Sequence, residues 1–269
     1  MNKKIQNRYN ANLNFMHTEI AINELKTFFE YNFSEALNLL KVSSPIQVHK
    51  GKKDLHSFTD WKRTTLFKYG FTQGEGLYTN LRSIKINIPI EQYDPFFTEE
   101  WEWEKIILEK HKNIDYLITE ANNIYSSIKK TEEHMKQFHP TFQPVLPKGF
   151  QKLSKVELES AIANTAVTNT EEKLIKRCGA ILFLNEYKNT NDESYTIGLL
   201  KVWNPLLKSP VTLFSIGLRA DVGKFNSVGG KVDQTNLCML LLKKLNDQQV
   251  KPYSWKEDND VKNISLGTK

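Results

Sequence analysis

Residues 228–242 read VGGKVDQTNLCMLLL, in which two adjacent glycines precede a run of apolar residues. The apolar run predicts a buried helix over about 235–245. Gly229 and Gly230 predict a turn in front of that helix, because glycine permits sharp bends and close approach of a ligand to the backbone. Three polar residues stand where a ligand would need room: Lys231, Asp233 and Asn236. The stretch therefore predicts a ligand-binding turn whose entrance is filled by side chains.

The chain in front of this stretch alternates between helical and strand patterns. Apolar residues recur at helical spacing from Thr18 and predict a helix that ends before Ser43. A long helix is expected over about 99–138, and Ser154 with Glu157 forms a capping box for a short one. Strand-like segments occupy 68–86, 179–184, 194–203 and 210–219. Helices around mostly antiparallel strands indicate an α+β fold.

Length and composition predict one folded domain with polar ends. The chain has 269 residues, of which 39% are hydrophobic, which is enough for a sizeable core. We place the domain at 18–255, between an N-terminal tail, 1–17, and a polar C-terminal tail, 256–269. No run approaches the ~18 apolar residues that a membrane span needs, and the first residues lack the apolar middle of a signal peptide. A cytoplasmic protein is expected.

The charge of the chain is uneven, and its cysteines are few. Residues 1–90 carry 13 basic and 7 acidic residues, whereas 91–269 carry 24 of each, so the net charge of +6 lies in the first third. A solvated basic face is favoured, and a contact with nucleic acid or an acidic partner stays open. Cys178 and Cys238 are expected to be buried thiols, because neither has a Cys or His neighbour at metal-ligand spacing.

Several segments together resemble asparagine synthetase A, the ammonia-dependent aspartate–ammonia ligase. They are DWKRTTLFKYGFTQGEGLYTNLRSI (60–84), EEWEWEKI (99–106), VWNPLL (202–207), FSIGLRAD (214–221) and VGGKVDQTNLCMLLL (228–242). The resemblance implies an antiparallel β-sheet flanked by helices, like the catalytic domain of class II aminoacyl-tRNA synthetases, and a homodimer. It also implies a reaction in which ATP and Mg²⁺ activate aspartate as an aspartyl-adenylate, from which ammonia displaces AMP.

Residues that serve the nucleotide in the family are replaced here. Lys85 stands where the family has the arginine that meets the α-phosphate, and lysine lacks the planar fork of a guanidinium. Leu199 and Thr212 stand where the family has acids that bind the metal–ATP complex, and neither coordinates Mg²⁺ as a carboxylate does. Asn236 replaces the arginine that stacks on adenine, and Glu100 replaces a glutamine on the substrate side. The resemblance therefore implies coordinated loss of the site.

Other residues of the family pattern survive. The aspartate-gripping loop between Pro45 and the DWKR segment is too short, but the surrounding basic and polar residues are kept. For Arg219, an ion pair is favoured over a substrate contact. The vestigial nucleotide and substrate pocket predicted in this way consists of Lys62, Arg63, Glu75, Tyr78, Lys85, Glu100, Leu199, Thr212, Ser215, Arg219, Gly229, Gly230 and Asn236.

These losses predict a catalytically inactive or strongly impaired homologue, with no catalytic residue, no metal and no need for ATP. Its role would then be that of a structural or binding subunit of a protein assembly, as a homodimer or a heteromer. A working ligase with ATP and Mg²⁺ is the first alternative, and a tRNA- or nucleic-acid-binding paralogue is the second. The partner surfaces considered are Lys50, Lys52, Lys53, the helix end 129–136, the tail after Trp255, and the aromatic residues Phe96, Phe97, Trp101 and Trp103, for most of which a place in the core or at a dimer seam is favoured.

Overall fold

The computed structural model describes residues 15–45, 47–50, 58–86, 97–138, 142–163, 170–188, 194–219 and 225–250. At its centre, the described residues form one nine-stranded sheet in the order β1-β3-β4-β9-β8-β7-β6-β5, with β2 also paired to β3. The strands are β1 (Leu39–Lys41), β2 (Gln47–Lys50), β3 (Gly76–Ile86), β4 (Phe97–Ile107), β5 (Gln151–Ser154), β6 (Ala180–Lys188), β7 (Ser194–Asn204), β8 (Ser209–Arg219) and β9 (Asn226–Asp233).

The six long strands from β3 to β6 along this order are antiparallel throughout. The short strands β1, β2 and β5 run parallel to their neighbours at the margins, so the sheet is mixed rather than wholly antiparallel. The expected α+β class is confirmed. The GEGLYT, VGG and VWNP segments lie on β3, β9 and β7 of this one sheet, with β4 and β8 between them.

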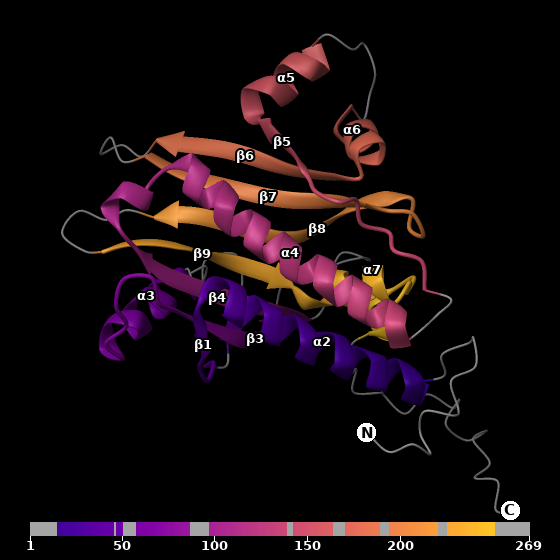
Figure 1. Cartoon of the computed structure of the whole chain (residues 1–269), viewed down its shortest axis with the longest axis horizontal. Coiled ribbons are helices and arrows are strands. Elements are labelled where there is room, and N and C mark those ends of the chain that lie inside the picture. Colours follow the sequence, from indigo (N-terminus) through magenta and orange to yellow (C-terminus); the bar gives the residue numbers. More distant parts are fainter. Residues whose placement is uncertain are drawn as a thin grey trace, which may run out of the picture.

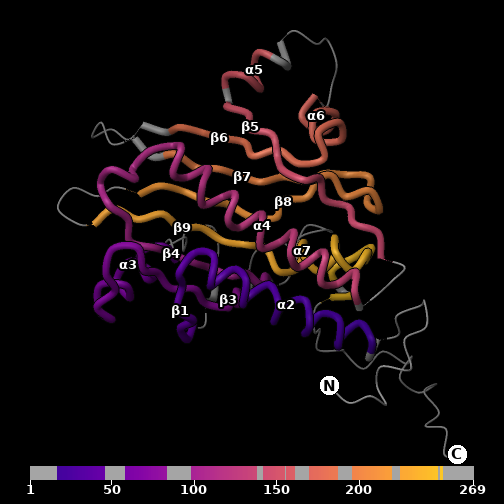
Figure 2. Tube along the Cα trace, viewed as in Figure 1, coloured from indigo at the N-terminus to yellow at the C-terminus, as the bar shows by residue number. Residues whose placement is uncertain are grey.

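Helices cover both faces of the sheet. On one face, α2 (Phe15–Leu37) and α4 (Ile114–Phe138) run side by side across the strands, as Figures 1 and 2 show, and α7 (Gln234–Leu241) packs into the same core. The other face is covered at one end by α3 (Phe58–Lys68) and at the other by α5 (Lys155–Ala163) with α6 (Thr170–Cys178). Two short 3₁₀ turns complete the described elements: η1 (Glu109–His111) and η2 (Asp247–Gln249).

The prediction of one helix over 99–138 is wrong for its first part. Residues 97–107 form strand β4, and the helix begins only at Ile114. The cause is the period-two alternation of EWEWEK, which turns Trp101 and Trp103 toward α2, where both are fully buried among its phenylalanines. The glutamates between them turn to the opposite face. Trp101 and Trp103 are therefore core residues, as favoured.

Other local predictions hold only in part. The capping box is present, since the backbone N–H of Ser154 donates to the Glu157 carboxylate (2.7 Å) and that of Glu157 donates to the Ser154 hydroxyl (3.2 Å). The first helix ends earlier than expected, because Asn38 adopts a positive φ of 56° and the chain turns into β1. Cys238 is buried as expected, and burial raises the pKa of its thiol to about 12, whereas Cys178 is partly exposed.

The ends of the predicted domain lie outside the described residues, which begin at Phe15 and stop at Val250. The boundaries at 17 and 255 therefore stay predictions. None of the helices in the described ranges is long and apolar enough to cross a membrane.

Candidate functional site

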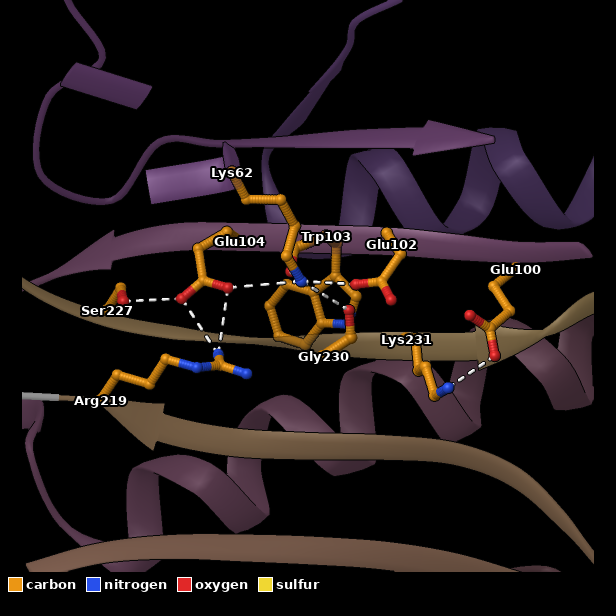
Figure 3. A network of polar contacts seen from close by, with 9 residues as sticks. All are labelled: Lys62, Glu100, Glu102, Trp103, Glu104, Arg219, Ser227, Gly230 and Lys231. Carbon is orange, nitrogen blue, oxygen red and sulfur yellow. Dashed lines mark hydrogen bonds and ion pairs between the residues drawn. The ribbon is translucent and has the colours of Figure 1, made fainter. Parts of the chain in front are cut away.

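A row of three carboxylates lies along one face of β4, at the centre of the sheet. Glu100, Glu102 and Glu104 are alternate residues of this strand, so their side chains share the face opposite α2 and α4. Figure 3 shows that each carboxylate meets a basic side chain from a different element: Lys231 from β9, Lys62 from α3 and Arg219 from β8. Most of the sequence-predicted pocket residues lie around this row.

Lys62 is the most enclosed of the three basic side chains, with 1% of its surface exposed. Its Nζ donates to the Glu102 carboxylate at 2.6 Å and to the backbone carbonyls of Trp103 and Gly230 at 3.0 and 3.2 Å. The Glu104 carboxylate lies 3.5 Å away. Because these partners saturate the three N–H donors of the ammonium, Lys62 joins α3 to two strands and has no donor left for a ligand.

Glu104 is fully buried and equally well satisfied. The Nη1 atom of Arg219 donates to its two oxygens at 3.1 and 3.0 Å, and the Ser227 hydroxyl donates to Oε1 at 2.6 Å. The ion pair expected for Arg219 is present. Its guanidinium is held against the protein's own carboxylate (Figure 3), so a substrate carboxylate would have to compete with Glu104 for it.

Glu100 and Lys231 form the outer pair of the row, 2.6 Å apart. Burial alone would lower the pKa of Lys231, but the carboxylate of Glu100, helped by those of Glu102 and Asp233, raises it above the ordinary value. Lys231 is therefore a cation in this position. The negative charge that Glu100 brings to the substrate side is thus neutralised by a side chain of the same chain.

The glycine pair is not a turn, contrary to expectation. Gly229 and Gly230 lie inside β9, and neither has a positive φ. Their role is close packing: a Cβ on Gly229 would lie 2.1 Å from a carboxylate oxygen of Glu104, and one on Gly230 would lie 2.0 Å from the backbone oxygen of Ser215. Glycine is needed here because the ion-pair row and the neighbouring strand leave no space for a side chain.

The polar residues after the glycines are structural. Asp233 caps α7, since its carboxylate accepts the backbone N–H of Asn236 at 2.8 Å. The Asn236 carboxamide donates to the backbone carbonyl of Thr212 at 3.0 Å and to Asp233 at 3.1 Å. The side chain that replaces the adenine-stacking arginine of the family therefore ties α7 to β8.

Leu199, Thr212 and Ser215 share the face of the carboxylate row. Leu199 pairs with Ser215 across β7 and β8, and Ser215 pairs with Lys231 across β8 and β9. Neither Leu199 nor Thr212 offers a carboxylate, and the three carboxylates nearby are already in ion pairs. The residues present therefore do not fit a metal–ATP complex as Mg²⁺ ligands.

Arg63 and Lys85 lie outside the carboxylate row. Arg63 donates to the Ser227 hydroxyl and to the backbone carbonyl of Phe225 at 2.5 and 2.8 Å, and its guanidinium lies over the Phe225 ring. Lys85 pairs with His49 between β3 and β2, and its side chain lies outside the described part of the structure.

Two predicted residues do not belong to this site. Tyr78 turns to the α2 face, where its hydroxyl donates to Glu30 at 3.3 Å, because residues of β3 alternate between the faces. Glu75 precedes β3 and accepts hydrogen bonds from the backbone N–H and the hydroxyl of Thr72, which lower its pKa. Both belong to a different part of the fold.

Sequence reasoning missed three residues that hold the site together: Glu102, Glu104 and Ser227. Reading residues 99–107 as a helix hid the signal, because a helix would scatter these glutamates around its axis. Read as a strand, the alternation of WEWEK places all three carboxylates on one face.

Comparison with known families supports the resemblance drawn from the five segments. The model of the aspartate–ammonia ligase family (AsnA) matches residues 52–227, more than half of the chain. The aspartate–ammonia ligase of Clostridium perfringens (strain SM101) is 27% identical over 314 residues, covering 93% of this chain and 94% of that protein. That of Clostridium tetani is 26% identical over 318 residues, covering 94% and 93%.

Solved structures of synthetases share the fold. The asparaginyl-tRNA synthetase of Pyrococcus horikoshii, complexed with asparaginyl-adenylate, matches with a TM-score of 0.63 and 13% identity over 87% of this chain and 68% of that one. The aspartyl-tRNA synthetase of Entamoeba histolytica matches with a TM-score of 0.59 and 14% identity over 87% of this chain. This chain spans 58% of that synthetase, which is less than two thirds of its length. The expected class II synthetase-like fold is confirmed.

Proposed function

Because this chain belongs to the aspartate–ammonia ligase family, we propose that it is a member that has lost the ATP-dependent reaction and acts as a binding or structural subunit of a protein assembly. The observation that carries the proposal is the carboxylate row. Each of Glu100, Glu102 and Glu104 is neutralised by a basic residue of the same chain. A charged substrate would have to compete with these pairs for the same side chains.

The nucleotide side of the site supports the same proposal. A triphosphate needs cations on its oxygens and carboxylates for its Mg²⁺. Leu199 and Thr212 supply neither, and Asn236 is engaged with Asp233 and the backbone of β8. Binding of ATP would therefore begin with the loss of contacts that hold α7.

Exposed aromatic side chains support a role in binding another protein. Tyr31 on α2, Phe67 at the end of α3 and Tyr69 just after it are 66, 77 and 66% exposed. Leu40 of β1 and Tyr69 line the same hollow of about 570 Å³ beside Glu75. Large exposed aromatics are typical anchors of protein interfaces. Among the partner surfaces considered from sequence, Lys52, Lys53, Phe96 and the tail after Trp255 lie outside the described residues.

The second candidate is a working aspartate–ammonia ligase. The names of the relatives favour it, since the proteins that match over 93% or more of the chain are aspartate–ammonia ligases. Lys62, Ser215 and Arg219 also keep the residue types of the family pattern. For activity, Arg219 would have to break its ion pair with Glu104 in order to bind substrate, and Lys231 would have to break its ion pair with Glu100. A nucleic-acid-binding role and a cytoplasmic location stay predictions.

Calorimetry with ATP and Mg²⁺ tests the loss of the reaction. We expect no saturable heat with the purified full-length chain, whereas the ligase of Clostridium perfringens, run as a control, binds. Saturable, Mg²⁺-dependent binding of ATP would favour the second candidate.

Cross-linking and capture from native cells tests the subunit role. We expect a defined partner to co-purify with the wild-type chain and to be lost with the Phe67→Ser, Tyr69→Ser double variant, while the unfolding midpoint stays the same. Capture that is equal for both proteins would contradict the assignment of this surface.

A further inference from the structure

A second recess lies on the α2 face of the sheet, away from the carboxylate row. Its volume is about 420 Å³, within the range typical of small-molecule sites. It is bounded by α2, β3, the start of β4 and the start of α7. Its lining includes Glu19, Lys26, Arg82, Glu99 and Gln234.

Glu99 forms the floor of this recess and is 3% exposed. It is next to Glu100 in β4, but consecutive residues of a strand point to opposite faces, so Glu99 turns toward α2. Its Oε2 accepts from the Nζ of Lys26 at 3.0 Å, and its Oε1 accepts from the Nε of Arg82 at 2.8 Å. Two cations thus share one carboxylate, and the floor has a surplus of one positive charge.

These cations keep unused donors. Arg82 engages Glu99 only through Nε, and its terminal Nη1 and Nη2 atoms have no hydrogen-bond partner among the described residues. Lys26 has a single described partner, Glu99, for its ammonium. The planar pair of guanidinium N–H groups matches the two oxygens of a carboxylate.

Gln234 provides an independent indication of a ligand. The residue is only 4% exposed, lines the recess, and its carboxamide has no hydrogen-bond partner within the described part of the chain. The carboxamide is not among the fully enclosed polar atoms without a partner, so its polar atoms open onto the recess, where water or a ligand can hydrogen-bond to them.

We propose that this recess binds a small organic carboxylate. Arg82 and Lys26 would hold the carboxylate, and the Gln234 carboxamide would bind a second polar group of the same molecule. Glu19 lies on the rim and is exposed, so water screens its charge from a ligand in the recess. The site lies on the opposite face from the carboxylate row, so it is independent of the function proposed above.

Calorimetry with succinate at low salt tests the site in the full-length chain. We expect saturable binding to the wild type that weakens by about tenfold or more in Arg82→Gln, because a charge-assisted bidentate contact is removed. Gln234→Leu should also weaken the binding of succinate, because it removes the carboxamide that lines the recess, and its urea unfolding midpoint verifies that the variant is folded. Arg177→Gln, the same charge change on an exposed residue of α6, should bind as the wild type does.

Absence of heat with succinate would overturn the proposal, as would equal binding by the wild type and Arg82→Gln. Binding of inorganic phosphate but not succinate would contradict the assignment to carboxylates. Because the test uses no nucleotide, its failure is distinguishable from failure of the proposed function, which is measured with ATP and Mg²⁺.

Discussion

The Nζ atom of Lys231 in β9 lies 2.6 Å from Oε1 of Glu100 in β4, on the face of the sheet where the family pattern expects substrate groups. Both residues depart from that pattern, and the charge of one cancels the charge of the other. The same face carries two further pairs, Lys62 with Glu102 and Arg219 with Glu104. Each of the three carboxylates of the row is therefore paired with a basic side chain of the same chain.

Replacing Lys231 by methionine should lower the free energy of unfolding by about 1 kcal/mol or less. The pair is worth little because nearly half of the Lys231 side chain is exposed to water, which screens the attraction. Urea denaturation measures the change. Lys231→Arg keeps the charge, so its free energy of unfolding should stay close to that of the wild type. If Lys231→Met lost as much stability as we expect for Lys62→Met, the pair could not be an outer one exposed to water.

Replacing Lys62 by methionine should be far more damaging, by about 3–5 kcal/mol. The change leaves the Glu102 carboxylate and two backbone carbonyls without their buried donor. Urea denaturation again provides the measurement. The double variant Lys62→Met, Glu102→Gln should recover part of the loss, because it removes the unpaired charge. Lys173→Met on the exposed side of α6 is the matched control and should change stability little.

The close packing around the glycine pair predicts a large difference between two Gly→Ala changes. In Gly230→Ala the new methyl group would meet the backbone of Ser215 and Ile216, which cannot move aside without shifting β8. We expect a loss of about 3 kcal/mol or an insoluble protein. Gly149→Ala, which has nothing within 4 Å of its added Cβ, should unfold at nearly the wild-type urea concentration. Equal stability of the two variants would show that β9 is not packed as described.

The hydrogen bonds of Glu30 predict that the protein loses stability at acidic pH. Burial alone would raise its pKa, but hydrogen bonds from Lys41, Trp101 and Asn80 outweigh burial and lower the pKa below the ordinary 4.5. A carboxyl with a lowered folded-state pKa contributes stability that is present above about pH 4.5 and is lost as the pH falls through the folded-state pKa.

Unfolding by urea between about pH 7 and pH 3 measures this contribution. The wild type should lose stability more steeply below pH 4.5 than Glu30→Gln, whose side chain does not titrate. Glu35→Gln, on the same helix, is the control and should follow the wild type. Identical curves for the wild type and Glu30→Gln would contradict the assignment.

Much of the fold could be predicted from the sequence, because its signals are local. The capping box of Ser154 and Glu157 and the apolar periodicity of α2 depend on residues a few positions apart. The segments that resemble the family also predicted a largely antiparallel sheet flanked by helices. The prediction was wrong for segment 99–107. Its charged residues favour a helix in isolation, but the alternation of its residues fits a strand that is buried on both faces. Its neighbours β3 and β9 decide the outcome, and the sequence alone does not place them beside it.

The candidate site was predictable as a set of positions but not as an arrangement. The motifs identified Arg219 and Asn236, but not their partners. Arg219 binds Glu104, 115 residues earlier in the chain, and Asn236 binds the backbone carbonyl of Thr212 in β8. Only the register of β4, β9 and β8 shows that the glycines serve packing and that Tyr78 faces the other side.

Incubation of the wild-type chain with aspartate, ammonium, ATP and Mg²⁺, with AMP and asparagine measured together, tests the loss of catalysis most directly. The ligase of Clostridium perfringens serves as the positive control under the same conditions. The paired charges of the carboxylate row and the absence of acids at Leu199 and Thr212 predict no AMP and no asparagine above a blank without protein. Formation of AMP in step with asparagine, dependent on both aspartate and ammonium, would contradict the account and identify the chain as a working ligase.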